Sequence, residues 1–168
     1  MTQITPQEIE SAANVLRGRI NFPLQVGIVL GSGLSDMAER AEKSVAVPYA
    51  QIPGFPQSTV EGHVGRFVGG FIEEASVLMM QGRVHYYEGY AMQQVALGIR
   101  LMAALGVRTL ILTNAAGAVN MSYKPGDFML IQDHINFMST NPLIGKHHAE
   151  WGERFVDQSE TYTPELMN

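Results

Sequence analysis

The stretch SVLMMQGRVHYYEGY, residues 76–90, joins an apolar run to a polar segment that lies between two glycines. The run at residues 76–80 is typical of a short strand buried inside a sheet, because it carries no charge and leads into a turn. A turn itself needs little more than Gly82 and Gly89. Between these glycines the chain adds a cation, an imidazole, two phenols and a carboxylate, namely Arg83, His85, Tyr86, Tyr87 and Glu88. These side chains indicate that the loop holds something anionic and hydroxylated.

An apolar run followed by a glycine-containing loop occurs twice more along the chain. Val26–Leu30 leads into Gly31-Ser32-Gly33, and residues 107–112 lead into Asn114-Ala115-Ala116-Gly117. Each run is short and apolar, which predicts a buried strand. The sequence therefore predicts several strands that end in loops able to approach a ligand closely.

Helical patterns lie between these strands. Thr5-Pro6-Gln7-Glu8 combines an N-cap threonine, a proline at the first helical position and a capping-box glutamate. Residues 92–105 show an apolar helical period, and Gly106 is expected to end that helix. Residues 66–72 and 76–80 predict a hairpin of two strands, while residues 48–65 predict a long loop. Strands that alternate with helices predict an α/β layered domain.

The composition favours one globular domain over residues 1–168. The chain is 46% hydrophobic and 16% charged, which is typical of a folded protein. Its net charge of −5 argues against a general nucleic-acid binder, which needs a basic face. With 0 cysteines, disulfides, thiol catalysis and cysteine-based zinc sites are excluded, and a cytoplasmic location fits. Neither a signal peptide nor a membrane span is predicted.

Gly31-Ser32-Gly33-Leu34 is expected between a strand and a helix, where backbone N–H groups can bind an anion. The Ser32 hydroxyl would add a further donor. The alternative is a glycine turn whose serine caps the next helix. A dinucleotide-binding fingerprint is disfavoured, because Asp36 stands where a third glycine is required.

Arg83 and His85 are two positions apart, so an extended backbone would project both side chains to the same side. Arginine offers a bidentate fork to phosphate and histidine a second donor. Glu88 could hold His85 in one tautomer or favour its protonated form. The alternative is a surface ion pair between Arg83 and Glu88, with Tyr86 or Tyr87 packed on the core.

Two further loops complete a set of four glycine-bearing loops, which comprises residues 31–34, 62–65, 82–89 and 114–117. The loop at residues 62–65 contains His63, and the last loop offers small residues that could contact a flat ligand. In open α/β sheets, ligands bind beyond the carboxyl ends of the strands. The four loops together predict an oxyanion pocket within an acidic protein.

A metal site is not predicted. Asp133-His134 and His147-His148 are adjacent pairs, and neighbouring residues do not face the same way. The chain also lacks the helical H-x-x-x-H pair typical of zinc enzymes.

Seven segments taken together closely resemble the trimeric class of purine nucleoside phosphorylases, in their order and with their spacing across essentially the whole chain. They are Gly31-Ser32-Gly33-Leu34, Ser58-Thr59-Val60-x-Gly62-His63-x-Gly65-Arg66, Gln81-Gly82-Arg83-x-His85-x-Tyr87-Glu88-Gly89-Tyr90, Thr113-Asn114-Ala115-Ala116-Gly117, Asp133-His134-Ile135-Asn136, Asn141-Pro142-Leu143-Ile144-Gly145 and Gly152-Glu153-Arg154-Phe155. The resemblance implies a three-layer α/β fold with a mixed, mostly parallel, twisted sheet flanked by helices.

The resemblance also implies an activity, the reversible phosphorolysis of purine (deoxy)ribonucleosides to free base and (deoxy)ribose 1-phosphate. Orthophosphate would be a co-substrate, with no cofactor or metal, and the partners would be the nucleoside and the other subunits of a homotrimer. By this analogy, phosphate would bind to Ser32, His63, Arg83, His85 and Ala115. The nucleoside would contact Tyr87, Ala116, Gly117 and Phe155, and the catalytic residues would be His85 and Glu88. A methylthioadenosine phosphorylase-like enzyme is the related alternative, although Asn114-Ala115-Ala116-Gly117 resembles the purine nucleoside phosphorylase version.

The end of the chain carries a further expectation. Thr163-Pro164-Glu165 has the pattern of a helix start, and members of the family continue for roughly another hundred residues, as the resemblance implies. We therefore expect a single nucleoside phosphorylase domain without its C-terminal part, in which the residues that select the base lie beyond Asn168. A fragment that binds phosphate without turnover, or an interaction module on the same scaffold, are the alternatives.

Overall fold

The computed structural model describes residues 4–57 and 64–167, which form two compact units, Met1–Ala115 and Ala116–Asn168. The first unit contains the sheet and its helices. The described part of the second unit consists of turns, irregular segments and two short 3-10 helices, η4 (Ala149–Trp151) and η5 (Pro164–Leu166). Across the described residues, no helix combines the length and apolarity needed to cross a membrane.

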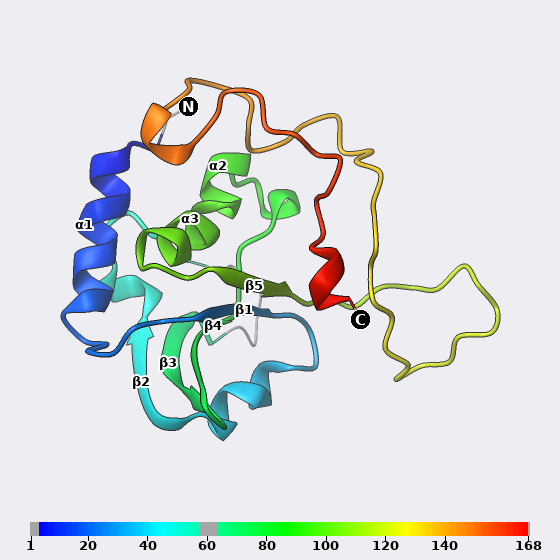
Figure 1. Ribbon diagram of the computed structural model, residues 1–168, viewed down its shortest axis with the longest axis horizontal. Helices are drawn as coiled ribbons and strands as arrows, with labels where there is room; N and C mark the ends of the chain where they lie inside the picture. Colours follow the sequence, from blue (N-terminus) through cyan, green and yellow to red (C-terminus); the bar gives the residue numbers. More distant parts are fainter. Residues whose placement is uncertain (1–3, 58–63, 168) are drawn as a thin grey trace. The chain divides into compact units, whose positions relative to one another are not determined.

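The sheet of the first unit has five strands in the order β2-β3-β4-β1-β5 (Figure 1). β1 (Val26–Leu30) lies between β4 (Ala75–Gln81) and β5 (Thr109–Leu112) and pairs parallel with both. β2 (Glu42–Pro48) and β3 (Arg66–Ile72) are antiparallel, and β3 and β4 form the predicted hairpin. The mixed sheet of the expected α/β fold is therefore confirmed.

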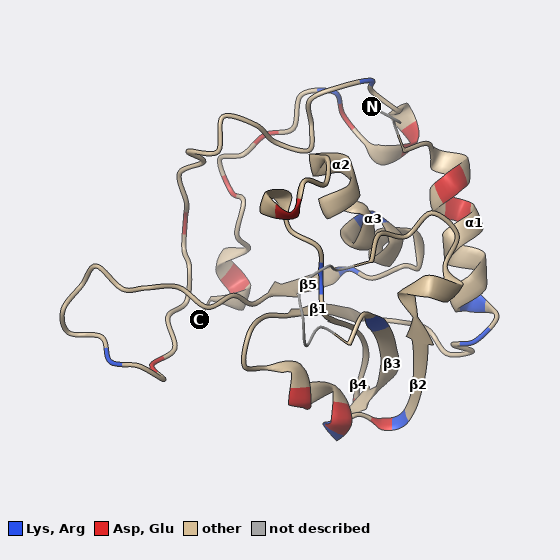
Figure 2. Ribbon diagram, turned by 180° about the vertical axis from the view of Figure 1, so that it is seen from behind, with Lys and Arg blue, Asp and Glu red and all other residues tan. Residues whose placement is uncertain are grey.

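Helices cover the sheet on both faces. On one face, α1 (Pro6–Arg17) and α3 (Leu97–Ala104) pack on strand residues such as Val29 and Leu78. On the other, Ala38 of the 3-10 helix η1 (Ser35–Arg40) packs on the alternate strand residues, among them Ile28. Side chains alternate between the faces of a strand, so both faces of β1 and β4 are buried. Figure 2 shows charged residues on α1 and η1 and none on β1 or β4.

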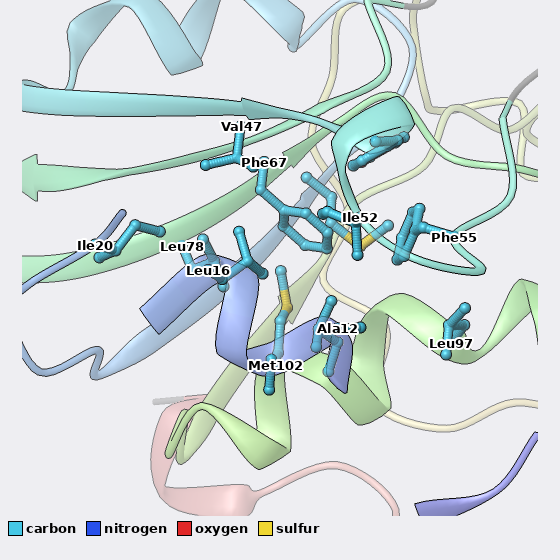
Figure 3. Close-up of a cluster of buried hydrophobic side chains, with 14 of the residues drawn as sticks. Ala12, Leu16, Ile20, Val47, Ile52, Phe55, Phe67, Leu78, Leu97 and Met102 are labelled. Atoms are coloured by element: carbon cyan, nitrogen blue, oxygen red, sulfur yellow. The ribbon is translucent and has the colours of Figure 1, made fainter. Parts of the chain in front are cut away.

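An aromatic cluster lies in the hydrophobic core on the face of the sheet that α1 and α3 cover. The rings of Tyr49, Phe55 and Phe67 lie with centroids between 4.5 and 5.3 Å apart. Figure 3 shows Phe67 near Leu78 in this buried cluster. Tyr49 belongs to the short 3-10 helix η2 (Tyr49–Gln51), which follows β2 directly.

The first helix forms as its sequence predicts. The Thr5 hydroxyl accepts a hydrogen bond from the Glu8 N–H at 3.3 Å, and Glu8 accepts one from the Thr5 N–H at 2.7 Å. This reciprocal contact satisfies two backbone donors at the helix start. The Thr5 N–H and the Thr5 hydroxyl, the latter at 2.9 Å, both donate to the Glu8 carboxylate and lower its pKa.

Four expectations for local structure were incomplete or wrong. β2 was not predicted, although Val45 and Val47 alternate with other residues in the way a strand requires. The helix expected over residues 92–105 is interrupted at Ala96, which separates α2 (Met92–Val95) from α3. β5 forms but is not buried, because β1 is its one neighbour in the described sheet. The helix start at Thr163 opens the single 3-10 turn η5.

Candidate active site

The glycine-bearing loops of the first unit meet at one edge of the sheet. β1, β4 and β5 are parallel, so the loops that follow them leave from the same edge. The Gly31 N–H donates to Thr113 Oγ1 at 2.7 Å, and Arg83 Nη1 donates to the Thr113 carbonyl at 2.8 Å. β3 is antiparallel to β4, so Gly65 reaches the same edge, where its N–H donates to the Gln81 carbonyl at 3.0 Å. The predicted convergence is confirmed for Gly31, Arg83, Thr113 and Gly65, whereas residues 62–63 lie outside the described residues and residues 116–117 belong to the second unit.

Glycine is required at Gly31 because two backbones approach closely there. A Cβ atom at this position would lie 2.5 Å from the Thr113 carbonyl oxygen and 2.9 Å from the Asn114 Cα. Gly33 has a φ of 84°, a left-handed conformation that side chains disfavour. Ser32, between them, is exposed. The alternative in which Ser32 caps the next helix is wrong, because the N-cap of η1 is Leu34 and makes no side-chain capping bond.

A buried tyrosine holds the start of the loop after β4. The Tyr49 hydroxyl donates to the Gly82 carbonyl at 2.6 Å, and Gly82 has a φ of 94°. Burial raises the pKa of Tyr49 far above its usual range, so the phenol stays protonated and remains a donor. Tyr49 therefore sets the backbone from which Arg83 projects.

Arg83, His85 and Glu88 form a continuous network. Arg83 Nε donates to His85 Nε2 at 3.3 Å, and His85 Nδ1 lies 2.9 Å from Glu88 Oε1. The same carboxylate oxygen accepts the His85 backbone N–H at 2.7 Å. The guanidinium can only donate and an ionised carboxylate can only accept, so these neighbours assign the ring proton to Nδ1. The expectations that Arg83 and His85 project to the same side and that Glu88 orients His85 are confirmed.

The two tyrosines of this loop do not pack on the core, and that alternative is wrong. Tyr86 is exposed, and Tyr87 is 76% exposed. The Tyr87 ring stacks on His85 with centroids 4.8 Å apart and an angle of 17° between the planes. Tyr87 therefore presents its hydroxyl and one ring face near the histidine that the network holds.

The remaining site candidates lie at three places. Ala115 ends the first unit, where its carbonyl accepts from Asn114 Nδ2 at 3.3 Å. His63 lies outside the described residues. Ala116, Gly117 and Phe155 belong to the second unit, where Phe155 is 88% exposed. The roles expected for these residues stay predictions.

Comparison with known proteins now identifies the family. Residues 25–168 match the family model described as "Phosphorylase superfamily". The chain belongs to the phosphorylase superfamily. It is 52% identical to purine nucleoside phosphorylase 1 of Geobacillus stearothermophilus over 94% of this chain and 58% of the relative. It is 42% identical to the purine nucleoside phosphorylase of Rattus norvegicus, over 98% of this chain and 58% of that protein.

Solved structures agree with this assignment. The chain matches isoform 2 of purine nucleoside phosphorylase from Schistosoma mansoni, in complex with cytosine and ribose-1-phosphate, with a TM-score of 0.92 and 42% identity. The match covers 99% of this chain and 59% of that structure. The chain thus spans 58–59% of the length of these relatives. Within the superfamily, the described fold is that of the purine nucleoside phosphorylases.

Two histidines of the second unit, His134 and His148, have aromatic neighbours. His134 Nδ1 is 3.0 Å from the Tyr162 hydroxyl, and the rings of His148 and Trp151 lie 4.7 Å apart. No group of three or more histidine, cysteine, aspartate or glutamate residues placed to hold a metal occurs among the residues that the structure describes.

Three residues that hold the loops of the candidate active site were given no separate role from the sequence. Thr113 contacts Gly31 and Arg83, Tyr49 contacts Gly82, and Gln81 donates to the Ser35 carbonyl at 3.0 Å. The sequence signal for Thr113 was its place at a strand end before a glycine loop. Gln81 has the same signal, because it ends β4 directly before Gly82. Tyr49 carries no such signal, because its contact joins segments that are distant in the sequence.

Proposed function

We propose that this protein catalyses the reversible phosphorolysis of purine nucleosides to a free purine base and a pentose 1-phosphate. The similarity to purine nucleoside phosphorylases supports the proposal, since relatives match over 94–98% of the chain. A structure similar over 99% of the chain contains ribose-1-phosphate, the product that such a reaction would form.

The observation that carries the proposal is the position of Arg83. Its guanidinium is held by the Thr113 carbonyl and by His85 Nε2, and Thr113 also binds the Gly31 N–H. A fixed cation therefore lies close to a glycine loop that contains an exposed serine. Charge-assisted donors and backbone N–H groups are the groups that bind a tetrahedral oxyanion.

The proposed roles follow the resemblance residue by residue. The proposed phosphate ligands are Ser32, His63, Arg83, His85 and the backbone of Ala115, and the proposed nucleoside contacts are Tyr87, Ala116, Gly117 and Phe155. Glu88 acts on His85, whose ring it orients, and its own side chain is only 3% exposed.

Phosphorolysis requires that the phosphate be positioned more than that it be activated as a nucleophile. The N-glycosidic bond breaks as a phosphate oxygen bonds to the anomeric carbon, and the base leaves with the bonding electrons and takes up a proton. Phosphate is already a nucleophile at neutral pH, whereas the pentose becomes cationic as the base departs. A phosphate anion held beside that carbon stabilises the positive charge, and Arg83 keeps the anion in place.

His85 must change its hydrogen bonding when phosphate binds. In this structure Nε2 accepts from Arg83 Nε, so the neutral ring has no proton there to donate. To bind phosphate, the ring either gains a proton on Nε2 or gives up the Arg83 contact. In either case the Glu88 carboxylate, 2.9 Å from Nδ1, keeps the ring in its orientation.

The proposal includes the assembly and the cellular setting. A homotrimer would bring Phe155 of one subunit over the ribose site of its neighbour, which would exclude water from the developing cation. Orthophosphate would be a co-substrate and no metal would take part. A cytoplasmic location rests on the same resemblance.

The test is a phosphate-dependent inosine cleavage assay. One sample is the 168-residue chain, and the other is a chimera that continues it with the Geobacillus stearothermophilus sequence beyond the matched region. We expect release of hypoxanthine from the chimera when orthophosphate is present, and little or none from the 168-residue chain. A folded chimera that cleaves no purine nucleoside under conditions in which the Geobacillus enzyme is active would contradict the proposal. Equal turnover by both samples would show that the 168-residue chain is sufficient.

A further inference from the structure

Thr113 connects the two loops that the proposed phosphate site needs. Its hydroxyl accepts the Gly31 N–H at 2.7 Å and donates to the Val29 carbonyl at 2.9 Å. Its own N–H also donates to Val29, at 3.1 Å, and its carbonyl accepts Arg83 Nη1 at 2.8 Å. One residue at the end of β5 therefore contacts the end of β1, the glycine loop and the guanidinium.

The far end of the glycine loop is held independently. Gln81, a side chain only 3% exposed, donates from Nε2 to the Ser35 carbonyl at 3.0 Å. Its Oε1 accepts Arg66 Nε at 2.6 Å, and Arg66 pairs with Glu39 of η1 at 2.6 Å. The loop from Gly31 to Ser35 is thus fixed at both ends by side chains from other strands. With one end held by Gln81, the hydroxyl of Thr113 sets where the other end lies.

The side chain of Thr113 binds the glycine loop, whereas its backbone binds Arg83. The carbonyl that binds Arg83 is present whatever the side chain, whereas the bond to the Gly31 N–H depends on the hydroxyl. Gly31 is buried, so its N–H would lose its partner without that oxygen. The hydroxyl therefore sets the spacing between the loop amides and the guanidinium.

We infer that Thr113 is a positioning residue for oxyanion binding: by holding the Gly31 N–H, it places the N–H groups of Ser32 and Gly33 and the Arg83 guanidinium on the same tetrahedral anion. The inference rests on the proposed function, because orthophosphate is the anion that phosphorolysis requires. Thr113 itself acts through Gly31 and Arg83. A displacement of either group by a fraction of an ångström weakens an anion site built from preorganised donors.

The experiment measures orthophosphate affinity of the full 168-residue chain by calorimetric titration. Thr113→Val keeps the branched shape and removes the hydroxyl, and Thr113→Ser keeps the hydroxyl. Thr109→Val makes the same chemical change at the other end of β5 and is the matched control. We expect Thr113→Val to weaken orthophosphate binding by about fivefold, the loss of one hydrogen bond. Thr113→Ser and Thr109→Val are expected to keep the wild-type affinity.

Rescue by serine separates positioning from a general structural role. If the strand needs only a β-branched side chain at position 113, Thr113→Val would preserve its structure and Thr113→Ser would disturb it. Wild-type affinity in Thr113→Val, or equal weakening in the valine and serine variants, would overturn the inference. Should Thr113→Val fail to fold, as judged by circular dichroism, Thr113→Ala takes its place with the same expectation.

Arg83→Ala separates this inference from the proposed function. If Arg83→Ala weakens orthophosphate binding and Thr113→Val does not, the proposed phosphate site is supported and the role of Thr113 is wrong. If the wild-type chain and Arg83→Ala are equally unable to bind orthophosphate, the proposed phosphate site and the role of Thr113 are both wrong.

Discussion

β4 and β5 have much in common and differ in burial. Both are apolar, both pair parallel with β1, and both lead into a loop of the candidate active site. Leu78 and Met79 of β4 are completely buried, whereas Ile111 and Leu112 of β5 are 46% and 62% exposed. β4 lies between β3 and β1, and β5 stands at the end of the strand order. An apolar run therefore predicts a strand, while its neighbours decide whether the strand is core.

The largest expected effect concerns the stability of these two strands. Leu78→Ala should lower the free energy of unfolding by about 3 kcal/mol, because it opens a cavity in a closely packed core. Ile111→Ala, at a half-exposed site, should lower it by about 1 kcal/mol or less. Urea unfolding of the 168-residue chain and the two variants measures both values. Equal losses would mean that β5 is as buried in solution as β4.

The loop after β4 should carry more of the phosphate affinity than any charge near β5. In the chimera with the Geobacillus sequence, Arg83→Ala should cost about 1.5–3 kcal/mol, roughly ten- to a hundredfold in the use of phosphate. Arg108, exposed at the amino end of β5, is the matched control, and Arg108→Ala should have little effect. Steady-state kinetics against phosphate at saturating nucleoside provide the measurement. If Arg83→Ala keeps the wild-type kcat and the wild-type KM for phosphate, Arg83 has a structural role and does not bind phosphate.

A third prediction concerns the buried tyrosine that holds the loop after β4. Tyr49→Phe removes the bond to the Gly82 carbonyl and should cost about 1 kcal/mol of stability at pH 8. In the unfolded chain Tyr49 ionises near its ordinary pKa of 10.0, whereas burial raises that pKa in the fold. The native state therefore keeps a proton that the unfolded state loses, and stability falls as pH rises above about 10.

The phenylalanine variant lacks this ionisation. The stability difference between the wild type and Tyr49→Phe should therefore shrink above pH 10, by up to about 1.4 kcal/mol per pH unit. Urea unfolding at pH 8 and at pH 10.5 checks the slope. A constant difference across this range would show that the phenol ionises as readily in the fold as in the unfolded chain.

The smallest expected effect concerns Phe155 of the second unit, which is 88% exposed. If Phe155 serves the site of a neighbouring subunit, a mixture of Phe155→Ala and excess Arg83→Ala subunits of the chimera should exceed the activity of either parent. Some interfaces would then join an intact Arg83 to an intact Phe155. Subunit exchange is verified by mass spectrometry of labelled chains. Activity that averages the two parents despite exchange would show that Phe155 acts within its own subunit.

The sequence predicted those parts of the fold whose interactions are local. The capping box joins Thr5 to Glu8, three residues apart, and the predicted hairpin forms from β3 and β4. The contact of Glu88 with His85 was predictable for the same reason, since the two residues lie within one turn of the loop. β2 was missed because its alternation is confined to Val45 and Val47, and because Val47, its single buried position, depends on pairing with β3.

The sequence by itself determined the family, the strands at the centre of the sheet and the residue types that gather at its carboxyl edge. Tertiary structure alone decided which groups hold them there. Thr113 and Gly31 are 82 residues apart, and Tyr49 and Gly82 are 33 apart. No local pattern encodes such contacts, because a hydroxyl in one segment finds its partner only after the parallel strands have aligned. Burial of β5 follows the same logic, since it depends on neighbours that an apolar run does not specify.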